Sequence, residues 1–297
     1  MKRIAFFGAG GKMGIGICRK LDKAGFDLRC VEIAPEGVAA LRKIGLDVLP
    51  KERAVADADA VVLAVPDEAV VDVAAEVVPS VASGALVQML DPCAAHSGRL
   101  PERDDIGYVV THPCHRSFLE TEKRGQHVVA ALYRGTEAHY ELGVEIAKVM
   151  YGPTLDIHRL TVDQLVMLEP AISETVAGAA LSIIKIGFDE VVRQGVPKKA
   201  AFDFLMGHIM ATIRVLFGLR GFFSDGAYLT MENGIKRIVR DDWRETLSPE
   251  SVREQVEAIL DGTRLEGGGD NPITAEDLRQ AVRDAQKAAG TTGLIQP

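Results

Sequence analysis

Four cysteines occur among the 297 residues, and no two of them have CxxC spacing. This excludes a disulfide framework and a zinc ribbon. The sequence also lacks a basic stripe, and its formal net charge of −8 argues against nucleic-acid binding. No internal repeat is evident, and no apolar run approaches the ~20 residues of a membrane span. We therefore expect a reduced, cytoplasmic protein with no nucleic-acid or membrane partner.

A glycine-rich turn follows the first apolar run of the chain. The run at residues 4–7 predicts a buried strand, and an amphipathic helical pattern begins after the turn. Between them, Gly8, Gly11 and Gly14 recur at every third position. Glycines there allow a tight turn and let the backbone approach a pyrophosphate at the helix N-terminus. The predicted cofactor-binding residues of this turn are Gly8, Gly11, Lys12 and Met13.

An acidic residue ends the second predicted strand. Glu32 follows residues 28–31, about 20 positions beyond the turn. A carboxylate there accepts hydrogen bonds from the adenosine ribose hydroxyls and repels a 2′-phosphate. Arg42 and Lys43 lie further on and could attract a phosphate. The acidic residue favours NAD over NADP as the cofactor.

Polar residues stand where several other predicted strands end. We predict these strands over residues 60–65, 85–90, 108–111 and 127–132, alternating with helices. Asp67, Asp91 and His112 follow three of them directly. In an open doubly wound sheet, ligands bind outside the carboxyl ends of the strands. These side chains should therefore line one crevice with the glycine turn.

The second half of the sequence has a helical pattern. It predicts a long helical stretch over 161–194, interrupted at Glu169-Pro170, with further helices over 198–217, 249–260 and 275–289, and a loop-rich segment over 218–234. The predicted fold class is α/β, an N-terminal Rossmann doubly wound sheet followed by an all-helical domain. We assign residues 1–155 to the NAD-binding domain and 156–297 to a helical domain for substrate binding and dimerisation.

Several segments resemble a superfamily of dehydrogenases and reductoisomerases. Lys12-Met13-Gly14 resembles the end of the GxGxMG turn of 3-hydroxyisobutyrate and 6-phosphogluconate dehydrogenases. Residues 60–67 resemble their fourth strand, whose proline-bearing loop packs near the nicotinamide. His112-Pro113 resembles the HP pair of prephenate dehydrogenases, in which the histidine acts on a substrate hydroxyl. Residues 186–197 resemble a helix end and turn of the hydroxyisobutyrate dehydrogenases.

Over the whole chain, the sequence is most similar to the D-apionate oxidoisomerases of sugar-acid catabolism. The segments HPCHRSF at 112–118 and LEPA at 168–171 carry this resemblance. It implies that the chain oxidises a small branched or sugar-derived hydroxyacid with NAD and shifts a carboxylate-bearing carbon.

The hydroxyacid-dehydrogenase resemblance places the catalytic lysine of that family near Glu174. No lysine stands there, and Lys185 lies about three helical turns further on. This departure speaks against a lysine-assisted oxidation. A carboxylate in that place resembles the ketol-acid reductoisomerases, which hold divalent metal with helical acidic residues, although their Asp-x-x-x-Glu pattern is not reproduced. We assign Glu174 a catalytic role on this basis.

Hydride transfer needs a base for the hydroxyl proton, and histidine suits this because its pKa lies near neutrality. His112 is the predicted base, with packing of the loop as the alternative. His115 could share a metal or bind the substrate carboxylate, and Arg116 is the better carboxylate partner because a guanidinium pairs bidentately. Asp67 is predicted to contact the nicotinamide ribose, to cap the following helix, or to do both.

An α-ketol rearrangement also needs a cation to polarise neighbouring oxygens. We predict that His112 and Glu190 hold it. A histidine ligand points to zinc or manganese, whereas magnesium prefers oxygen ligands. Glu174 and Glu190 lie about 24 Å apart along a helix and cannot touch one ion within one subunit. A homodimer could bring different parts of the site together.

Two other functions compete with an oxidoisomerase. One is a simple prephenate-like or hydroxyacid dehydrogenase, which would act without metal. The other is a Rossmann protein that senses NAD without catalysis. The histidine in the predicted crevice and the helical carboxylates favour an enzyme.

Overall fold

The structure is a computed structural model of residues 1–297, and it describes all of them except 117–124, 220, 264, 266–273 and 293–297. The last two residues of the HPCHRSF segment therefore lie outside the described residues. So does the whole of 266–272, which its glycine-rich sequence predicts to be a flexible link. Contacts divide the chain into two compact units, Met1–Ser173 with Arg244–Arg264, and Glu174–Trp243 with Leu265–Pro297. The predicted domain boundary at residue 155 falls inside a strand of the first unit. Each unit is described by itself.

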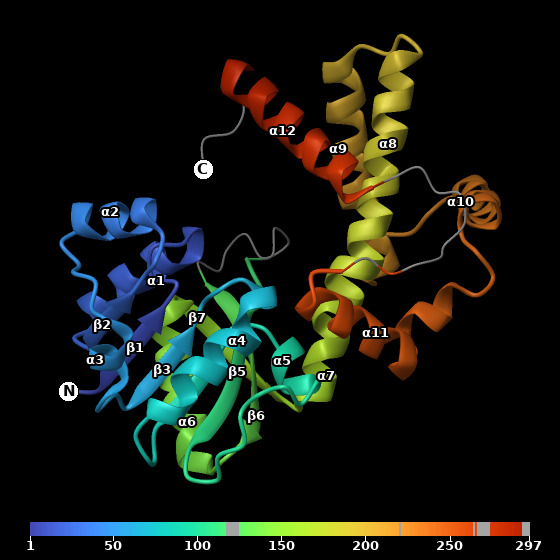
Figure 1. The fold of residues 1–297 in the computed structure, drawn as a ribbon. Coiled ribbons are helices and arrows are strands. Elements are labelled where there is room, and N and C mark those ends of the chain that lie inside the picture. The colour runs from blue at the N-terminus through green and yellow to red at the C-terminus, as the bar shows by residue number, and fades with distance from the viewer. Residues whose placement is uncertain (117–124, 220, 264, 266–273, 293–297) are drawn as a thin grey trace. The chain divides into compact units, whose positions relative to one another are not determined.

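The first unit contains a seven-stranded sheet and the helices that cover it (Figure 1). Its strands are β1 (Arg3–Phe7), β2 (Asp27–Val31), β3 (Ala60–Leu63), β4 (Leu86–Met89), β5 (Gly107–Pro113), β6 (Gln126–Arg134) and β7 (Thr154–Leu160). Its helices are α1 (Lys12–Lys23), α2 (Pro35–Lys43), α3 (Lys51–Val55), α4 (Asp67–Val77), α5 (Cys93–His96), α6 (Glu137–Met150), α7 (Val162–Val166) and α11 (Pro249–Leu260), with 3-10 turns at Val78–Ser80 and Trp243–Leu247.

The strand order is β2-β1-β3-β4-β5-β6-β7, and every neighbouring pair is parallel except β5 with β6. This confirms the predicted N-terminal Rossmann sheet. The continuous apolar sequences of β1 and β3 reflect burial on both faces, as parallel strands covered by helices require. Strand β7 was not predicted, and Val48 forms an isolated parallel bridge with Cys30 outside the named strands.

Two apolar layers enclose the sheet. One face packs against α1 and α6, through buried residues that include Ile17 and Ile146. The other face packs against α4, α5, α7 and α11. Helix α11 adds Val252, Val256 and Leu260 to this second layer, although it follows the helical unit in sequence. The four cysteines, all within the described residues, form no disulfide, as predicted.

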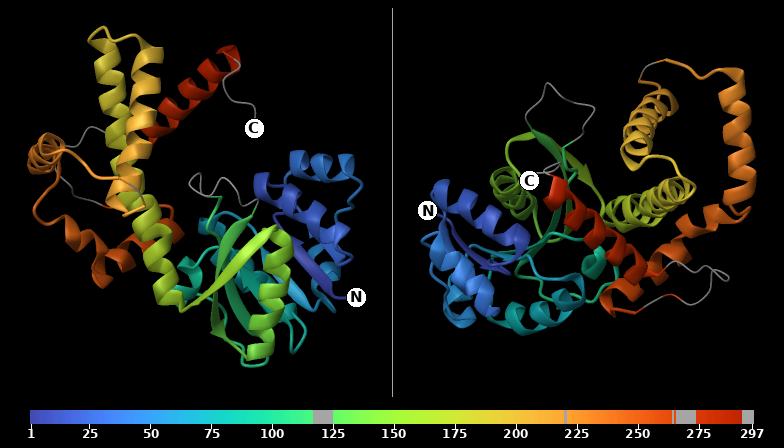
Figure 2. Two further views of the ribbon diagram at one scale, coloured as in Figure 1. Left: turned by 180° about the vertical axis from the view of Figure 1, so that it is seen from behind. Right: turned by 90° about the horizontal axis from the view of Figure 1, so that it is seen from above.

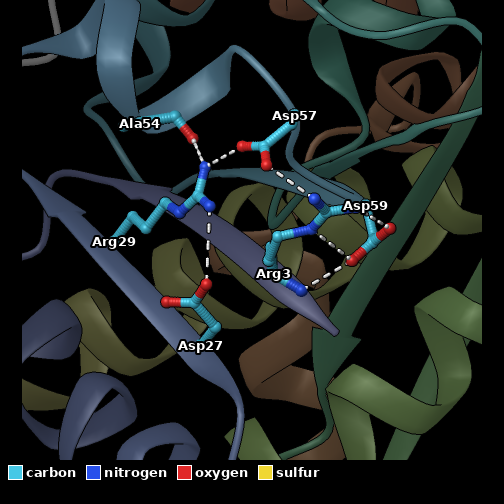
Figure 3. A network of polar contacts seen from close by, with 6 residues as sticks. All are labelled: Arg3, Asp27, Arg29, Ala54, Asp57 and Asp59. Atoms are coloured by element: carbon cyan, nitrogen blue, oxygen red, sulfur yellow. Dashed lines mark hydrogen bonds and ion pairs between the residues drawn. The ribbon is translucent and has the colours of Figure 1, made fainter. Parts of the chain in front are cut away.

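A charged network joins the strands at the edge of the sheet opposite the glycine turn (Figure 3). Asp59 accepts a hydrogen bond from the backbone N–H of Arg3 at 2.7 Å, and it also pairs with the Arg3 guanidinium. Arg29 on β2 donates to Asp57 and to the carbonyl oxygen of Ala54. The hydrogen bond from Arg29 lowers the pKa of Asp57. The network therefore fixes the start of β1 against β2 and the loop before β3.

The second unit is helical. Its elements are α8 (Ala179–Arg193), α9 (Lys198–Leu216), α10 (Asp225–Ile238) and α12 (Ala275–Thr292). Helices α8 and α9 lie side by side (Figure 2). Helix α10 occupies much of the segment predicted to be loop-rich, and Ser224 caps it by accepting a hydrogen bond from the backbone N–H of Ala227. An all-helical second part is confirmed.

A wide helical segment, Met167–Gly178, connects α7 to α8. Glu169 has an extended backbone there (φ −134°, ψ 113°), just before Pro170, at the predicted interruption. By length and composition alone, the stretch Val162–Arg193 is long and apolar enough to cross a membrane. The sequence-based expectation that no apolar run reaches this length therefore does not hold by this criterion. This is weak evidence for a membrane, because core helices of other proteins meet the same criterion.

Candidate functional site

The glycine turn ends β1 and begins α1. Gly8 has φ +74°, and a Cβ on it would lie 2.2 Å from the carbonyl oxygen of Ala64. A Cβ on Gly14 would lie 2.2 Å from the carbonyl oxygen of Gly8. Both positions thus require glycine for close backbone approach. Gly11 is the N-cap of α1 and provides no side-chain cap, so the first turn of the helix offers its N–H groups to an anion. Lys12 and Met13 form that first turn and are exposed.

Glu32 joins the glycine turn to the loop after β2. Its Oε2 accepts a hydrogen bond from the backbone N–H of Gly10 at 2.8 Å. Its Oε1 accepts from the N–H groups of Ile33 and Ala34 at 2.8 and 2.9 Å. A carboxylate has about four acceptor positions, so capacity for a ribose hydroxyl remains. Glu32 therefore lies beside the turn, where the sequence prediction needs it, and it also holds the backbone of that region.

Three carboxylates and a histidine gather at the carboxyl ends of β3, β4 and β5. The pKa of Asp67 is raised to about 6, chiefly by burial and also by the neighbouring carboxylates of Asp91, Glu68 and Glu169, while His112 opposes them. Asp91 behaves in the same way: burial raises its pKa, whereas hydrogen bonds from Cys93 and the charge of His112 lower it. The backbone N–H of Cys93 donates to Asp91 Oδ1 at 2.7 Å. These side chains are close enough to share one electrostatic environment.

The tautomer of His112 follows from its hydrogen bond. Its Nδ1 lies 2.8 Å from the carbonyl oxygen of Leu90, which can only accept, so Nδ1 carries the proton in this contact. In the neutral ring, Nε2 then holds the lone pair and can accept a proton. The surrounding carboxylates stabilise the imidazolium that would result. The ring of His115 lies 6.1 Å from that of His112, centroid to centroid, and Arg116 follows as an exposed residue.

The remaining predicted residues have other surroundings. Helix α4 begins at Asp67 with Pro66 as its N-cap, so Asp67 is not the cap. Glu174 and Glu190 belong to the second unit, whereas His112 belongs to the first. Glu174 is exposed. Glu190 accepts hydrogen bonds from Arg193 at 2.6 and 2.7 Å and from Gln194 at 2.6 Å, and these contacts lower its pKa. The catalytic role of Glu174 and the metal pair of His112 and Glu190 stay predictions.

Comparison with known proteins gives the family. A D-apionate oxidoisomerase of Rhizobium rhizogenes is 41% identical over 274 residues, covering 87% of this chain and all of that protein. The D-apionate oxidoisomerase of Cupriavidus necator is 38% identical over 273 residues, covering 87% of this chain and 99% of that protein. The chain belongs to the D-apionate oxidoisomerase family. It is accordingly an enzyme of the oxidoreductase class, which argues against a non-catalytic NAD sensor.

Family models and solved structures agree with this placement of the chain among the D-apionate oxidoisomerases. Residues 3–90 match the model for NADP oxidoreductase, coenzyme F420-dependent, and residues 115–260 match that for the C-terminal part of decarboxylating phosphogluconate dehydrogenase. A crystal structure of a semialdehyde dehydrogenase NAD-binding protein from Cupriavidus necator, in complex with calcium and NAD, is 38% identical, with a TM-score of 0.84 over 87% of this chain and 99% of its own. An NADH-preferring ketol-acid reductoisomerase from an uncultured archaeon shares the fold, at 16% identity and a TM-score of 0.62, covering 99% of this chain and 88% of its own. Binding of NAD or NADP by the first unit follows from this fold.

Two members of the carboxylate group received no role from the sequence. Asp91 was placed at a strand end, and Glu169 was one of several acidic residues on the helical stretch, at its interruption before Pro170. For Asp91, the sequence signal was its position after a strand, because the carboxyl ends of parallel strands meet at one edge of the sheet. Glu169 carried no such signal, since its approach to Asp67 depends on the extended backbone at the helix interruption.

Proposed function

We propose that this chain oxidises D-apionate, or a closely similar branched hydroxyacid, with NAD and rearranges its carbon skeleton. The observation that carries the proposal is His112, with its protonated Nδ1 held by Leu90 and its Nε2 available, among the carboxylates at the strand ends. The relatives named D-apionate oxidoisomerase supply the substrate class.

In the proposed oxidation, the residues of this chain carry out one proton transfer. A bound dinucleotide supplies the acceptor for the hydride. His112 Nε2 takes the proton of the substrate hydroxyl while the carbon-bound hydrogen leaves as hydride, so that the C–O single bond becomes a carbonyl. Asp67, Asp91 and Glu169 then stabilise the imidazolium. Arg116 is the proposed partner of the substrate carboxylate.

NAD is the proposed cofactor rather than NADP. The glycine turn leaves room for a pyrophosphate at the start of α1, and Glu32 lies beside that turn. A 2′-phosphate next to this carboxylate would be repelled. Asp67 follows β3, which lies on the other side of β1 from β2. It is the proposed contact of the nicotinamide ribose.

The rearrangement is the step for which we propose a divalent cation, zinc, manganese or magnesium. Such a shift needs polarisation of two neighbouring oxygens. His112 Nε2 is a suitable nitrogen donor only in a step in which it is not the proton acceptor, because its one lone pair cannot bind a cation and take the substrate proton at the same time. Glu190 would first have to give up its pairing with Arg193, so it is the weaker of the two predicted ligands.

The helical unit is the proposed place of substrate binding and dimerisation. Large apolar side chains on α8 and α9 are exposed in the single chain, among them Leu181 at 56%, Phe202 at 52% and Phe204 at 69%. A cytoplasmic homodimer would cover them. Light scattering after size-exclusion chromatography should give twice the chain mass, and Phe204→Asp should reduce it; a monomeric wild type would contradict the dimer.

The activity test follows NADH formation with D-apionate and with linear hydroxyacids, with and without chelator, and identifies the product skeleton by NMR. We expect turnover of D-apionate with a rearranged product. His112→Ala should lower kcat by about a hundredfold or more, the usual range for a general base, while NAD affinity measured by calorimetry stays unchanged. His96→Ala is the control, since it removes a histidine that pairs with Asp163 and that the proposed mechanism does not use.

Two outcomes would overturn the proposal. Turnover of linear hydroxyacids only, with no skeletal change and no effect of chelator, would make the chain a simple dehydrogenase. An unchanged kcat in His112→Ala would remove His112 as the base, even if D-apionate is the substrate.

A further inference from the structure

A second group of metal-binding side chains lies on strands β6 and β7, apart from the residues used above. It consists of His127, Asp156 and His158, whose ligand atoms all lie within 4.8 Å of one another. All three belong to the first unit. Among the residues that the structure describes, this is the group of three or more histidine, cysteine or acidic side chains whose ligand atoms lie this close together.

The backbone explains how the three side chains meet. In the parallel pairing of β6 with β7, Gln126 faces Thr154, but Val128 faces Ile157. Strand β7 therefore contains one extra residue, a bulge, opposite His127. Asp156 belongs to this bulge, and His158 stands two positions after it, so the two side chains project from the same face of β7.

The alternation of side chains places His127 on that face as well. Val129, two residues after His127, and Leu160, two after His158, both pack in the apolar layer that also contains α4 and α11. The rings of His127 and His158 stack with centroids 5.3 Å apart and planes inclined by 25°. The group is therefore a shared feature of one sheet face rather than a chance meeting of loops.

The surroundings of the group suit an ion that exchanges with solvent. His127 is half-buried, and Asp156 and His158 are exposed. The carboxylate of Asp156 is oriented, because its Oδ1 accepts a hydrogen bond from the backbone N–H of Ile157 at 2.8 Å. A rigid β-ladder on one side and water on the other give both a fixed frame and an entry path.

We propose that His127, Asp156 and His158 bind one divalent cation of the zinc class. Two imidazole nitrogens and one carboxylate oxygen form a donor set that suits zinc, cobalt, nickel or iron(II), whereas magnesium and calcium prefer oxygen alone. Metal–ligand bonds of 2.0–2.2 Å in a tetrahedral site place the ligand atoms about 3.4 Å apart. Side-chain rotations that move these atoms by roughly 1–1.5 Å would therefore close the group around the ion. Three protein ligands leave a position for water or another oxygen ligand.

This site lies on the same sheet face as the proposed base. His112 on β5 pairs with Val129 on β6, and the backbone N–H of Cys114 donates to the carbonyl oxygen of His127 at 2.9 Å. Since paired residues project from the same face, His112 and His127 stand on neighbouring strands of one surface. The site nevertheless uses neither His112 nor Glu190, and it does not depend on the proposed function.

The test measures zinc binding by the full-length, untagged chain after it has been stripped of metal with chelator. Calorimetry with zinc chloride should show a tight site that remains in His112→Ala, so that it is counted apart from the cation proposed at His112. His158→Ala and Asp156→Asn should each weaken it by about a hundredfold or more, at least the loss seen when a supporting residue of a metal site is removed. Cobalt(II) should give the visible absorption bands of imidazole ligation in the wild type and lose them in His158→Ala.

The controls separate this site from other metal sites and from misfolding. His96→Ala removes a histidine that also contacts an aspartate, with its Nδ1 at 3.0 Å from Asp163 Oδ1. Within the described residues, His96 belongs to no group of three potential metal ligands, so zinc binding should be unchanged. Circular dichroism checks that the variants at Asp156 and His158, both exposed, remain folded. Absence of tight zinc binding in the wild type, unchanged binding in both variants, or loss in His112→Ala alone would each overturn the proposal. Because the readout is metal binding and not turnover, its failure is distinct from failure of the proposed activity.

Discussion

Replacing Asp67 by asparagine tests whether the strand-end carboxylates share a desolvated environment. Burial and the neighbouring acidic groups raise the pKa of Asp67 from 3.8 to about 6. The native state therefore retains a proton that the unfolded state loses between these two values. Where the native state binds more protons, the free energy of unfolding falls as pH rises. Ionised Asp67 thus destabilises the fold, with no contribution below the unfolded pKa and its full cost above the folded one.

The size of this effect follows from the difference between the two pKa values. A shift from 3.8 to about 6 corresponds to about 3 kcal/mol in full, at about 1.4 kcal/mol for each tenfold change in the ionisation constant. Partial exposure to solvent screens it, and we expect about 1–1.5 kcal/mol. Asp67→Asn should therefore gain this much stability relative to the wild type between about pH 4 and pH 7.5.

The assay is urea denaturation followed by circular dichroism at four or more pH values in that range. Asp57→Asn is the matched control, because the hydrogen bond from Arg29 lowers the pKa of Asp57. Its contribution is present above the unfolded pKa of 3.8 and is lost only as pH falls below that value. The destabilisation of this variant should therefore stay nearly constant from about pH 5 to pH 7.5, without the trend expected for Asp67→Asn. If the free energies of unfolding of Asp67→Asn and of the wild type changed with pH in the same way, Asp67 would not be a desolvated carboxylate.

Two further predictions concern the cofactor site. Gly14→Ala should weaken NAD binding more than tenfold, as measured by calorimetry. The Cβ of the alanine would lie 2.2 Å from a backbone oxygen of the turn. Displacing that turn should cost more than about 1.4 kcal/mol, which corresponds to a tenfold change in affinity. Gly16→Ala, with nothing within 4 Å of its Cβ, should stay within about twofold, as surface substitutions do, and equal losses in both would contradict the close approach. Glu32→Ser should raise the ratio of kcat/KM for NADP to that for NAD, because the charge that repels a 2′-phosphate is removed; an unchanged ratio would exclude Glu32 from this discrimination.

The Rossmann half could be predicted because its sequence signals are local. The apolar runs of β1 and β3 and the glycine turn each indicate their own structure without knowledge of the rest. Strand β7 has no such signal: the sequence TLDIHRL alternates weakly, and most of its residues are half or fully exposed. Helix α10 was not predicted because it contains Gly226 and Gly234, and glycines usually indicate loops.

The candidate site could be predicted only in part, for a related reason. The positions of Asp67 and His112 follow from strand ends, which a correct list of strands provides. Glu169 joins them through a backbone irregularity that no periodicity reveals. The group of His127, Asp156 and His158 depends on β7 and on a bulge in its pairing. Without that strand, the three residues are merely scattered polar positions.

The return of α11 to the first unit has a consequence for how the protein is made. Val252, Val256 and Leu260 complete an apolar layer against α4 and α5, and Arg99 next to α5 pairs with Asp261 at 2.6 Å. On the ribosome, the chain must emerge through the whole segment 174–243 before this helix becomes available. The nascent first unit therefore keeps part of its apolar layer uncovered for that interval, a state in which chains aggregate or recruit chaperones. Slow translation within 174–243 should prolong this exposure and lower the yield of native protein.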